Sequence, residues 1–526
     1  GAAVTLLPRP RRFGKTLNMS MLNYFFSNAD DYRALFAGLG ISHDAEAMAH
    51  SGQYPVIFLS FKDVKETLAE DVFKRISRLI QDIYAAHSYL AETIEPEEAN
   101  YFQRIKQGSR DKVELAESIK RLSQFLHSYH HQPVVIIIDE YDMPINSAYS
   151  HGYYDELVGF LRNLLSGAFK DNPSVFKGIL TGILRIARES IFSGLNNIDV
   201  ATLTSPRYNQ HFGFTETETE QLLQDYELAY EVDAIRQWYN GYNFGGVTIY
   251  NPWSIISLAV NHGELAPYWL NTSDNALVRD LIAQAPYEVK QELESLLSVP
   301  GAVVRKPLNE HTVFRDIHMS DDAVWNFLLF SGYLAYKNKT LEGKHLHADF
   351  CIPNMEVASF YETAILEWFK QGITRPHQLS SILEALVTEQ FDYFCDSFEQ
   401  FVTDTFSYFD ITGSSPESFY HAFVLGMLVQ LQQTHSIKSN RESGFGRYDV
   451  CLIPHTKTKP AFVFEFKKAS TRRNETLEQA CAAALKQIEA NQYVAELKAS
   501  GFTTVYPIAI AFSGKKTLVT LGEPSR

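Results

Sequence analysis

The first 210 residues alternate short, continuously apolar runs with longer amphipathic stretches, and this alternation constrains the fold more than any other feature. Four runs have the length and composition of buried strands: Val4–Leu7, Val56–Phe61, Val134–Ile138 and Phe176–Thr181. Amphipathic segments such as Val72–His87 and Val113–Tyr129 lie between them. Strands that are apolar along their whole length are buried on both faces of a sheet. The alternation therefore predicts an α/β fold with a parallel sheet and helices on both faces.

The pattern changes twice further along the chain, so we predict three domains: residues 1–210, 211–410 and 411–526. The middle region is mostly helical in pattern and rich in aromatic residues, typical of a lid or linker, with a tight turn between short strands at Gly245-Gly246. The last region has α/β character. It contains the strand-like runs Arg447–Ile453 and Ala461–Lys467, then a helix over Thr476–Lys498 and a strand over Val505–Phe512.

Bulk properties favour a cytoplasmic globular protein. The chain has 526 residues, 45% hydrophobic and 21% charged, and no apolar run approaches the length of a membrane span. Its four cysteines have no CxxC spacing, which disfavours structural zinc and favours a reducing compartment. The sequence starts directly on a strand-like run without a signal peptide, so we expect an additional segment upstream.

A phosphate-binding loop is predicted between the first strand and the helix over Leu17–Phe26. Such a loop needs backbone N–H groups at a helix N-terminus, a lysine to neutralise charge and a hydroxyl for Mg²⁺. Gly14, Lys15 and Thr16 supply these in order, and Arg11, Arg12 and Phe13 complete the loop. Arg9 replaces the first glycine of GxxxxGK[ST], so the pattern is degenerate.

The strand over Val134–Ile138 ends in two carboxylates, which completes the prediction of a nucleotide site. Asp139 would join Thr16 in holding Mg²⁺, and Glu140 would activate water for attack on the γ-phosphate of ATP. The alternative is that both acids only cap a buried strand. Arg185 and Arg188 follow the next strand and could act as an arginine finger, in cis or in a homo-oligomer in trans; ordinary exposed helix arginines are the alternative.

A second candidate site lies on the predicted C-terminal hairpin. Folding the two runs about residue 457 sets Asp449 opposite Glu465, and Lys467 points the same way as Glu465. A register slip of one residue would break this convergence. Asp449 and Glu465 would hold Mg²⁺ or Mn²⁺, while Lys467 would position or deprotonate the attacking water. The alternative is a cross-strand salt bridge.

Three further residues could support this second site. Glu417, with His421 one turn later, or Glu442 could supply an additional acid, and Gln487 could orient water or a ligand. The segment Ser436–Glu475 holds nine Lys/Arg against four acids, within a chain of net charge −15. A basic island around metal ligands suits a nucleic acid, DNA or RNA. A solvated basic loop is the alternative.

Several motifs in order resemble the AAA-ATPase-like family of bacterial proteins, which typically carry a C-terminal nuclease-like domain of the PD-(D/E)xK superfamily. The N-terminal motifs are Arg9–Thr16, Ile138–Asp142, Gly182–Ala187, Ser190–Asn197 and Phe212–Thr215. The C-terminal motif is Gly446–Asp449 followed by Glu465-Phe-Lys467. The resemblance implies a P-loop ATPase fold joined to a nuclease fold, and an arginine in place of the first glycine is usual in that family.

Three hypotheses of function follow. The first is an ATP-binding and ATP-hydrolysing protein whose metal-dependent nuclease domain cleaves DNA or RNA under nucleotide control. The second is an NTPase switch or scaffold whose nuclease-like domain binds nucleic acid or protein without cleavage. The third is a nuclease with a vestigial nucleotide site, since the first glycine of the loop is missing.

Overall fold

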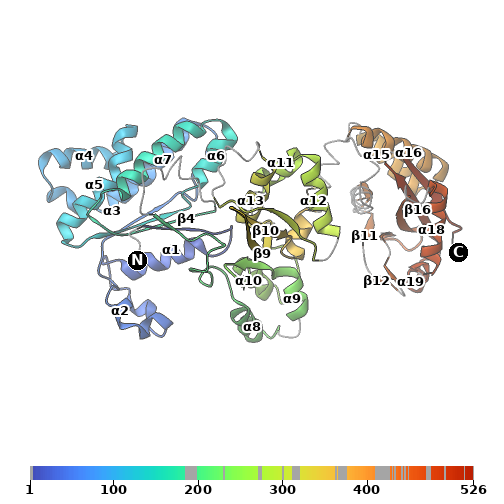
Figure 1. Ribbon diagram of the computed structural model, residues 1–526, viewed down its shortest axis with the longest axis horizontal. Coiled ribbons are helices and arrows are strands. Elements are labelled where there is room, and N and C mark those ends of the chain that lie inside the picture. The colour runs from blue at the N-terminus through green and yellow to red at the C-terminus, as the bar shows by residue number, and fades with distance from the viewer. Residues whose placement is uncertain are drawn as a thin grey trace. The chain divides into compact units, whose positions relative to one another are not determined.

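The chain forms two compact units in the computed structural model (Figure 1). The first comprises Gly1–Pro286 and Val303–Ser359, and the second Tyr287–Ala302 and Phe360–Arg526. The structure describes residues 4–183, 198–228, 232–269, 275–298, 301–310, 320–361, 364, 376–408, 424, 427–428, 431, 434–439, 442–443, 446–447, 449–469, 475–490, 493–514 and 516–524. The three-domain division remains a prediction, and the first unit joins the ATPase-like sheet to much of the predicted middle region.

A five-stranded parallel sheet forms the centre of the first unit. Its strands are β1 (Val4–Pro8), β2 (Val56–Ser60), β3 (Val134–Asp139), β4 (Val175–Gly182) and β5 (Ile198–Val200). Their order is β2-β3-β4-β1-β5, and every pairing is parallel. β4 therefore lies between β1, which leads into the predicted phosphate loop, and β3, which ends in Asp139. The predicted parallel α/β sheet is confirmed.

Helices cover both faces of this sheet (Figure 1). The helices of this part of the chain are α1 (Lys15–Phe26), α2 (Ala45–Met48), α3 (Ala69–Ala86), α4 (Pro96–Lys106), α5 (Lys112–His130), α6 (Met143–His151) and α7 (Tyr154–Phe169). α3, α5 and α7 pack on one face, and α1 lies on the other against β2 and β3. Every residue of β3 is buried, which explains its unbroken apolar sequence.

The rest of the first unit is largely helical but also contains two small antiparallel sheets. Its helices are α8 (Glu216–Asp225), α9 (Val232–Tyr239), α10 (Pro252–Val260), α11 (Ala276–Gln284) and α13 (Asp321–Ser331). β6 (Tyr242–Phe244) and β7 (Val247–Ile249) form a hairpin, and β8 (Val304–Pro307), β9 (Ala335–Glu342) and β10 (His345–Cys351) form a sheet ordered β8-β10-β9. Gly245 and Gly246 both have positive φ, as the predicted tight turn requires.

The second unit is built on a mixed five-stranded sheet ordered β11-β14-β15-β16-β17. These strands are β11 (His435–Ser439), β14 (Val450–Pro454), β15 (Ala461–Lys468), β16 (Val505–Ser513) and β17 (Lys516–Leu521). Its helices are α12 (Tyr287–Ser298), α15 (Pro376–Val387), α16 (Phe391–Tyr408), α18 (Leu477–Ala490) and α19 (Tyr493–Ala499). β15 pairs with β16 in parallel and with β14 antiparallel.

Side-chain alternation along β15 separates two cores in this unit. Phe462, Phe464 and Phe466 share a core with α15 and α16. Ala461 and Val463 face the opposite way and share a core with residues of α18 and α19. Because side chains alternate along a strand, Glu465 and Lys467 lie on the α18 face. β15 therefore buries these three phenylalanines on one face of the sheet and carries Glu465 and Lys467 on the other.

Two predictions of element boundaries in this unit are wrong. The first run was expected to be a strand from Arg447, whereas β14 begins at Val450 and Gly446–Arg447 is the short strand β13, paired with β12 (Glu442–Ser443) in a separate ladder. The helix predicted over 476–498 is instead the two helices α18 and α19. Within the described residues, no helix combines the length and apolar character needed to cross a membrane.

Candidate functional sites

The loop between β1 and α1 has the geometry of an anion site. Gly14 is the N-cap of α1 with φ 75°, and Arg12 also has a left-handed backbone with φ 67°. No side chain caps the N-terminus of α1 and no acid lies in its first turn. The N–H groups of that turn carry the positive end of the helix dipole. An anion such as a phosphate would satisfy them.

Lys15 is buried at the base of this loop, where its Nζ donates to the carbonyl oxygen of Pro10 at 2.9 Å. Burial lowers the pKa of Lys15, and the carboxylates of Glu140, Asp142 and Asp139 oppose that shift. The ammonium group is thus held in place by a neutral carbonyl and surrounded by three acids. A phosphate group would bring negative charge that compensates its burial.

Thr16 and Asp139 meet at the carboxyl edge of the sheet. The Thr16 hydroxyl donates to Oδ2 of Asp139 at 2.8 Å, and the Ser60 hydroxyl reaches the same oxygen at 3.4 Å. The other carboxylate oxygen of Asp139, Oδ1, is buried and has no hydrogen-bond partner in the described part of the chain. Two hydroxyls and an unsatisfied carboxylate oxygen are ligands that suit Mg²⁺. These residues therefore fit the cation expected beside a bound nucleotide.

Two polar residues flank Asp139 at this edge. Glu140 has a left-handed backbone with φ 51°, and burial raises the pKa of its carboxyl group while Lys15 opposes that shift. Thr181, at the end of β4, is fully buried, and its hydroxyl has no hydrogen-bond partner among the residues that the structure describes. Since β4 lies between β1 and β3, this hydroxyl lies at the same edge of the sheet as Asp139. We refer to Ser60, Asp139, Glu140, Asp142 and Thr181 as the strand-end cluster.

Two further side chains of the loop, Phe13 and Arg12, contact β6 and α10 of the first unit. The Phe13 ring is fully buried and lies 5.0 Å from each of the Tyr242 and Phe244 rings, centroid to centroid. The guanidinium of Arg12 lies 4.7 Å over the ring of Trp253. Arg11 is half-buried and electrostatically close to Lys15. Phe13 could therefore contact a nucleotide only through its backbone. Arg185 and Arg188 lie outside the described residues.

The second candidate site has the register that the sequence predicted. β14 and β15 pair Val450 with Phe464, and continuing this antiparallel register one residue sets Asp449 opposite Glu465. Oδ2 of Asp449 accepts the backbone N–H of Phe466 at 2.7 Å, which fixes that carboxylate beside β15. Asp449, Glu465 and Lys467 are thereby gathered on the α18 face of the sheet.

Glu465 is the buried centre of this group. Its side chain is 1% exposed, and its Oε1 lies 3.9 Å from Nζ of Lys467. The side-chain amide of Gln487 on α18 donates to the same oxygen. Alanines bring α18 close to the sheet: Ala480 and Ala484 of the helix pack with Ala509 and Ala511 of β16. The small side chains let the longer Gln487 reach the carboxylate.

The donor set of this group suits a hard divalent cation, because carboxylate oxygens are the ligands that Mg²⁺ and Mn²⁺ prefer. No cluster of three or more His, Cys, Asp or Glu side chains suited to a metal is found where the structure describes the chain. Glu417 and His421 lie outside the described residues. Glu442 is in β12, and its side chain is not described.

The fold places the lysines of the basic segment Ser436–Glu475 at different ends of β15. Lys457 and Lys459 lie in the connection between β14 and β15, at the end of the hairpin away from Asp449, and Lys457 donates to the carbonyl of Ser500. Lys467 and Lys468 end β15, and Lys438 lies opposite Cys451. Lysines that are close in sequence are therefore separated by the length of β15.

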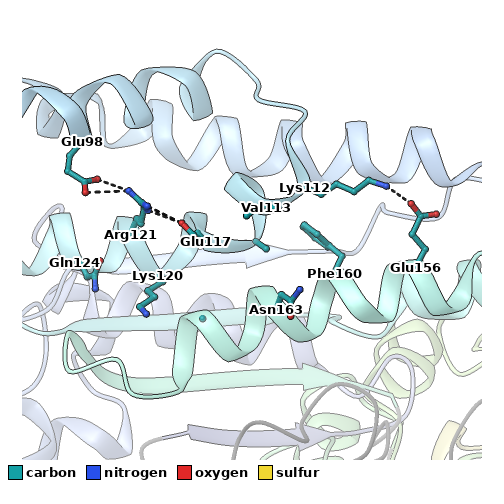
Figure 2. Close-up of a pocket in the computed structure, with 12 residues that line it drawn as sticks. Glu98, Lys112, Val113, Glu117, Lys120, Arg121, Gln124, Glu156, Phe160 and Asn163 are labelled. Carbon is teal, nitrogen blue, oxygen red and sulfur yellow. Dashed lines mark hydrogen bonds and ion pairs between the residues drawn. The ribbon is translucent and has the colours of Figure 1, made fainter.

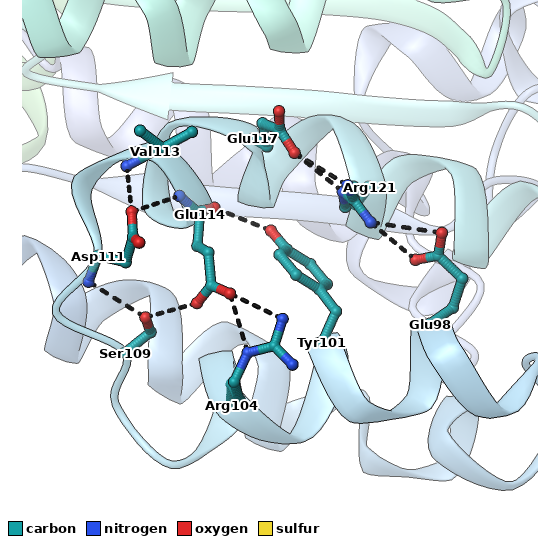
Figure 3. A network of polar contacts seen from close by, with 9 residues as sticks. All are labelled: Glu98, Tyr101, Arg104, Ser109, Asp111, Val113, Glu114, Glu117 and Arg121. Atoms are coloured by element: carbon teal, nitrogen blue, oxygen red, sulfur yellow. Dashed lines mark hydrogen bonds and ion pairs between the residues drawn. The ribbon is translucent and has the colours of Figure 1, made fainter.

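A cavity of about 760 Å³ lies elsewhere in the first unit, along α5 and α7 (Figure 2). Lys112 pairs with Glu156 across it, and Arg121 bonds both Glu98 and Glu117. Figure 3 shows the adjoining network, in which Arg104 binds Glu114. None of the predicted site residues lines this cavity, and its charged residues largely pair with one another.

Comparisons with known proteins agree with this two-part architecture. Residues 1–192 match the family model described as predicted AAA-ATPase, and residues 415–520 match the PD-(D/E)XK nuclease superfamily. The chain therefore joins an AAA-ATPase-like domain to a PD-(D/E)XK nuclease superfamily domain, and the resemblance inferred from its motifs is confirmed.

An individual relative matches almost the whole chain. It is an uncharacterized protein of the vnfD 5′ region of Azotobacter chroococcum mcd 1, 26% identical over 517 residues, covering 96% of this chain and 89% of that protein. Among solved structures, the Orc1 protein of Aeropyrum pernix in complex with DNA matches with 12% identity and a TM-score of 0.22. That match covers 69% of this chain and 86% of the Orc1 chain, and at this TM-score it carries no argument.

The motifs did not assign Ser60 or Asp142 to the strand-end cluster around Asp139. Ser60 ends β2 directly beside Asp139 in the parallel register, so a polar residue closing an apolar run was the available signal. Asp142 is buried, and its Oδ2 accepts the N–H of Ile183 at 2.8 Å, which ties the turn after β3 to the end of β4. Asp142 closes the motif Ile138–Asp142 that carries the family resemblance, but its residue type and position alone do not indicate this contact.

Proposed function

We propose that this protein binds and hydrolyses ATP at its N-terminal sheet and uses the C-terminal domain as a metal-dependent nuclease under nucleotide control. The observation that carries the nuclease assignment is the register of β14 and β15, which gathers Asp449, Glu465 and Lys467 on one sheet face. The Thr16–Asp139 hydrogen bond at the edge of the phosphate loop supports the ATP assignment.

At the ATP site, backbone N–H groups of the first turn of α1 would hold the β-phosphate, with Lys15 beside it. Thr16 and Asp139 would hold Mg²⁺, which neutralises charge on the phosphates. Glu140 would accept a proton from water as the water oxygen bonds to the γ-phosphorus and the bond to the leaving ADP oxygen breaks. Its raised pKa brings the carboxylate closer to the range in which a base works at neutral pH.

At the nuclease site, Asp449 and Glu465 would hold Mg²⁺ or Mn²⁺, which stabilises negative charge developing on the scissile phosphate. Lys467 would position the attacking water, whose oxygen bonds to phosphorus while the P–O bond to the leaving nucleotide breaks. Gln487 would orient Glu465 through its amide. These roles assign each member of the cluster one function.

The test is cleavage of labelled single- and double-stranded DNA and RNA with Mg²⁺ or Mn²⁺, with and without ATP. Asp449→Asn is the matched variant, since an amide oxygen can still accept the N–H of Phe466. Cutting by the wild type that disappears in Asp449→Asn would support the nuclease assignment. Cutting that is unaffected by ATP and by Lys15→Met would contradict nucleotide control.

One observation favours a second candidate, an ATPase whose nuclease-like domain binds nucleic acid or protein without cutting. Glu465 is almost fully buried and already contacts Gln487 and Lys467, as a purely structural ion pair would. This candidate predicts ATP turnover with no cleavage product under either metal. Glu465→Gln separates the two: a structural role predicts loss of stability alone, and a catalytic role predicts loss of cleavage in a folded protein.

A further inference from the structure

The residue that makes the phosphate loop degenerate is itself one of the largest fully buried side chains of the described chain. Arg9 is 1% exposed. One terminal nitrogen, Nη1, donates to the carbonyl oxygens of Pro8 and Ala201, each at 2.7 Å, and Nη2 donates to that of Tyr208 at 3.2 Å. A fully buried arginine that donates to three carbonyls has a structural role in the fold. An exposed residue that merely differs from the consensus would have no such contacts.

The surroundings of this guanidinium are neutral. Its Cζ lies 5.0 Å over the Phe212 ring and 5.6 Å over the Phe244 ring, and aromatic faces attract cations. Within the described residues, no carboxylate lies within ion-pair distance of Arg9. Burial lowers the pKa of Arg9 to about 10, so the group remains charged at neutral pH. Among the described residues, carbonyl dipoles and ring faces supply its stabilisation.

The backbone explains why a glycine is not needed at this position. Glycine in a tight loop is required where φ is positive. In this loop the positive φ values belong to Arg12 and Gly14, and Arg9 is not among the residues with positive φ. The Arg9 backbone N–H instead continues the sheet pattern, donating to the carbonyl of Gly182 at 2.9 Å. A side chain at residue 9 therefore carries no backbone penalty.

Two of the three carbonyls that Arg9 holds, those of Ala201 and Tyr208, belong to the segment Ala201–Phe212, and the third is that of Pro8 in β1. The segment Ala201–Phe212 packs in turn on the β6–β7 hairpin. The N–H of Gly245 donates to Leu203 O at 2.8 Å, and the side-chain amide of Asn209 donates to Gly245 O at 3.3 Å. A Cβ on Gly245 would lie 2.1 Å from Ser205 O, so the two backbones are in tight contact. Phe13 reaches the same hairpin from the loop.

Resting on the proposed function of ATP binding, we propose that Arg9 is a positioning residue that fastens the phosphate loop to the segment Ala201–Phe212 and thereby sets the affinity of the loop for phosphate. The arginine does not touch the nucleotide. It acts through the loop backbone, whose first residue it joins to the neighbouring segment. The replacement of the consensus glycine is then a functional feature of this chain.

Arg9→Gly tests this proposal because it restores the GxxxxGK[ST] consensus. If the arginine were only a defect in the loop, the variant would bind ATP as well as the wild type or better. The fastening predicts the opposite: Arg9→Gly binds ATP at least tenfold more weakly, and binds tripolyphosphate more weakly by a similar factor because the defect lies in the phosphate loop. Arg9→Lys, which keeps the charge but cannot bridge three carbonyls, falls between.

Hydrogen exchange without nucleotide supplies a second readout in the full chain. The fastening predicts faster amide exchange across 201–212 in Arg9→Gly, with β2 and β3 protected as in the wild type. Unchanged exchange in that segment, or unchanged or tighter ATP binding, would overturn the proposal. If Arg9→Gly does not fold, Phe212→Leu, which removes one ring face, must give the same two changes in smaller measure.

The failure of ATP binding by the wild type is a separate outcome. It would contradict the proposed function and with it the effect of Arg9 on affinity, while the exchange of residues 201–212 would still decide whether Arg9 fastens the segment.

Discussion

At the scale of single residues, two glutamates of the first unit, Glu140 partly buried and Glu356 fully buried, have raised pKa values for the same physical cause but different surroundings. Glu140 follows Asp139 and interacts electrostatically with Lys15, where a carboxylate could accept a proton in the proposed hydrolysis. Glu356 is fully buried and accepts the Ser254 hydroxyl at 2.8 Å and the Trp269 N–H at 2.7 Å, and burial raises its pKa to about 7. Glu140 is therefore suited to the proposed proton transfer, whereas Glu356 is suited to joining the Ser254 and Trp269 segments.

Replacing Glu140 with glutamine removes the proposed base of ATP hydrolysis. We expect Glu140→Gln to lower kcat by about 10²–10⁴-fold, since a general base contributes that much. ATP affinity should be retained, because Lys15 and the turn of α1 are unchanged. Protonated Glu140 cannot accept a proton, and its pKa is raised. As pH is lowered, the wild-type kcat should therefore begin to fall at a higher pH than it would with an ordinary glutamate as the base. Steady-state kinetics across pH, with ATP binding as the control, measures both; full activity in the variant would exclude Glu140 as the base.

Glu356 should make the first unit less stable as pH rises. The folded chain keeps the proton up to about pH 7, whereas the unfolded chain releases it near the ordinary value of 4.5. Stability is therefore lost across this window, by about 3 kcal/mol at about 1.4 kcal/mol per pKa unit. Glu356→Gln stays neutral, so we expect its stability relative to wild type to improve by that amount from pH 4.5 to 7. Urea unfolding at several pH values measures this, and a pH-independent difference would contradict it.

At the scale of elements, the end of β4 shows how closely the strand ends of the ATPase-like sheet are packed. Gly182 is its last residue, and a Cβ there would lie 2.4 Å from Oδ1 of Asp142 and 2.9 Å from the Tyr141 ring. The turn after β3 thus lies directly against β4. This contact holds the elements that carry Glu140 and Thr181 at one edge.

Gly182→Ala should therefore destabilise the first unit by about 1–3 kcal/mol, the usual cost of overpacking, and weaken ATP binding. Gly159→Ala is the matched control. Gly159 lies within α7, a Cβ there meets nothing within 4 Å, and an alanine in a helix gains about 0.5–1 kcal/mol over glycine. Thermal unfolding and ATP titration of both variants provide the measurement. Equal behaviour of the two would show that the Asp142 contact does not matter.

At the scale of the whole molecule, charge that is concentrated in the sequence is separated by the fold. The chain carries net charge −15, yet one segment of the second unit is basic. Because β15 runs from Ala461 to Lys468, Lys459 and Lys468 lie at opposite ends of the strand. Lys468 follows Lys467 at the end of β15 that carries the candidate site, although its side chain alternates to the opposite face of the sheet. Lys459 lies beyond the far end of the strand. A nucleic acid bound at the candidate site would reach one group of lysines and not the other.

Salt dependence of nucleic-acid binding distinguishes these lysines. We expect Lys468→Gln to weaken binding and to reduce the slope of log K against log salt by about 0.7–0.9, the loss of one phosphate contact. Lys459→Gln removes the same charge at the far end and should change neither quantity. Fluorescence anisotropy with one labelled oligonucleotide at several salt concentrations gives both values. Equal effects of the two variants would indicate a diffuse electrostatic attraction instead of a site.

The sequence by itself determined the two domain types, the parallel sheet, and the register that opposes Asp449 and Glu465. The domain types were implied by the resemblance of ordered motifs to known families. The sheet and the register follow from local patterns, since continuous apolar runs predict buried parallel strands and hairpin geometry follows from strand spacing. Only the tertiary structure decided the strand order, the addition of Ser60 and Asp142 to the strand-end cluster, the division of the lysines and the burial of Arg9. Each of these depends on contacts between residues far apart in the chain, such as Arg9 with Ala201, which no local pattern records.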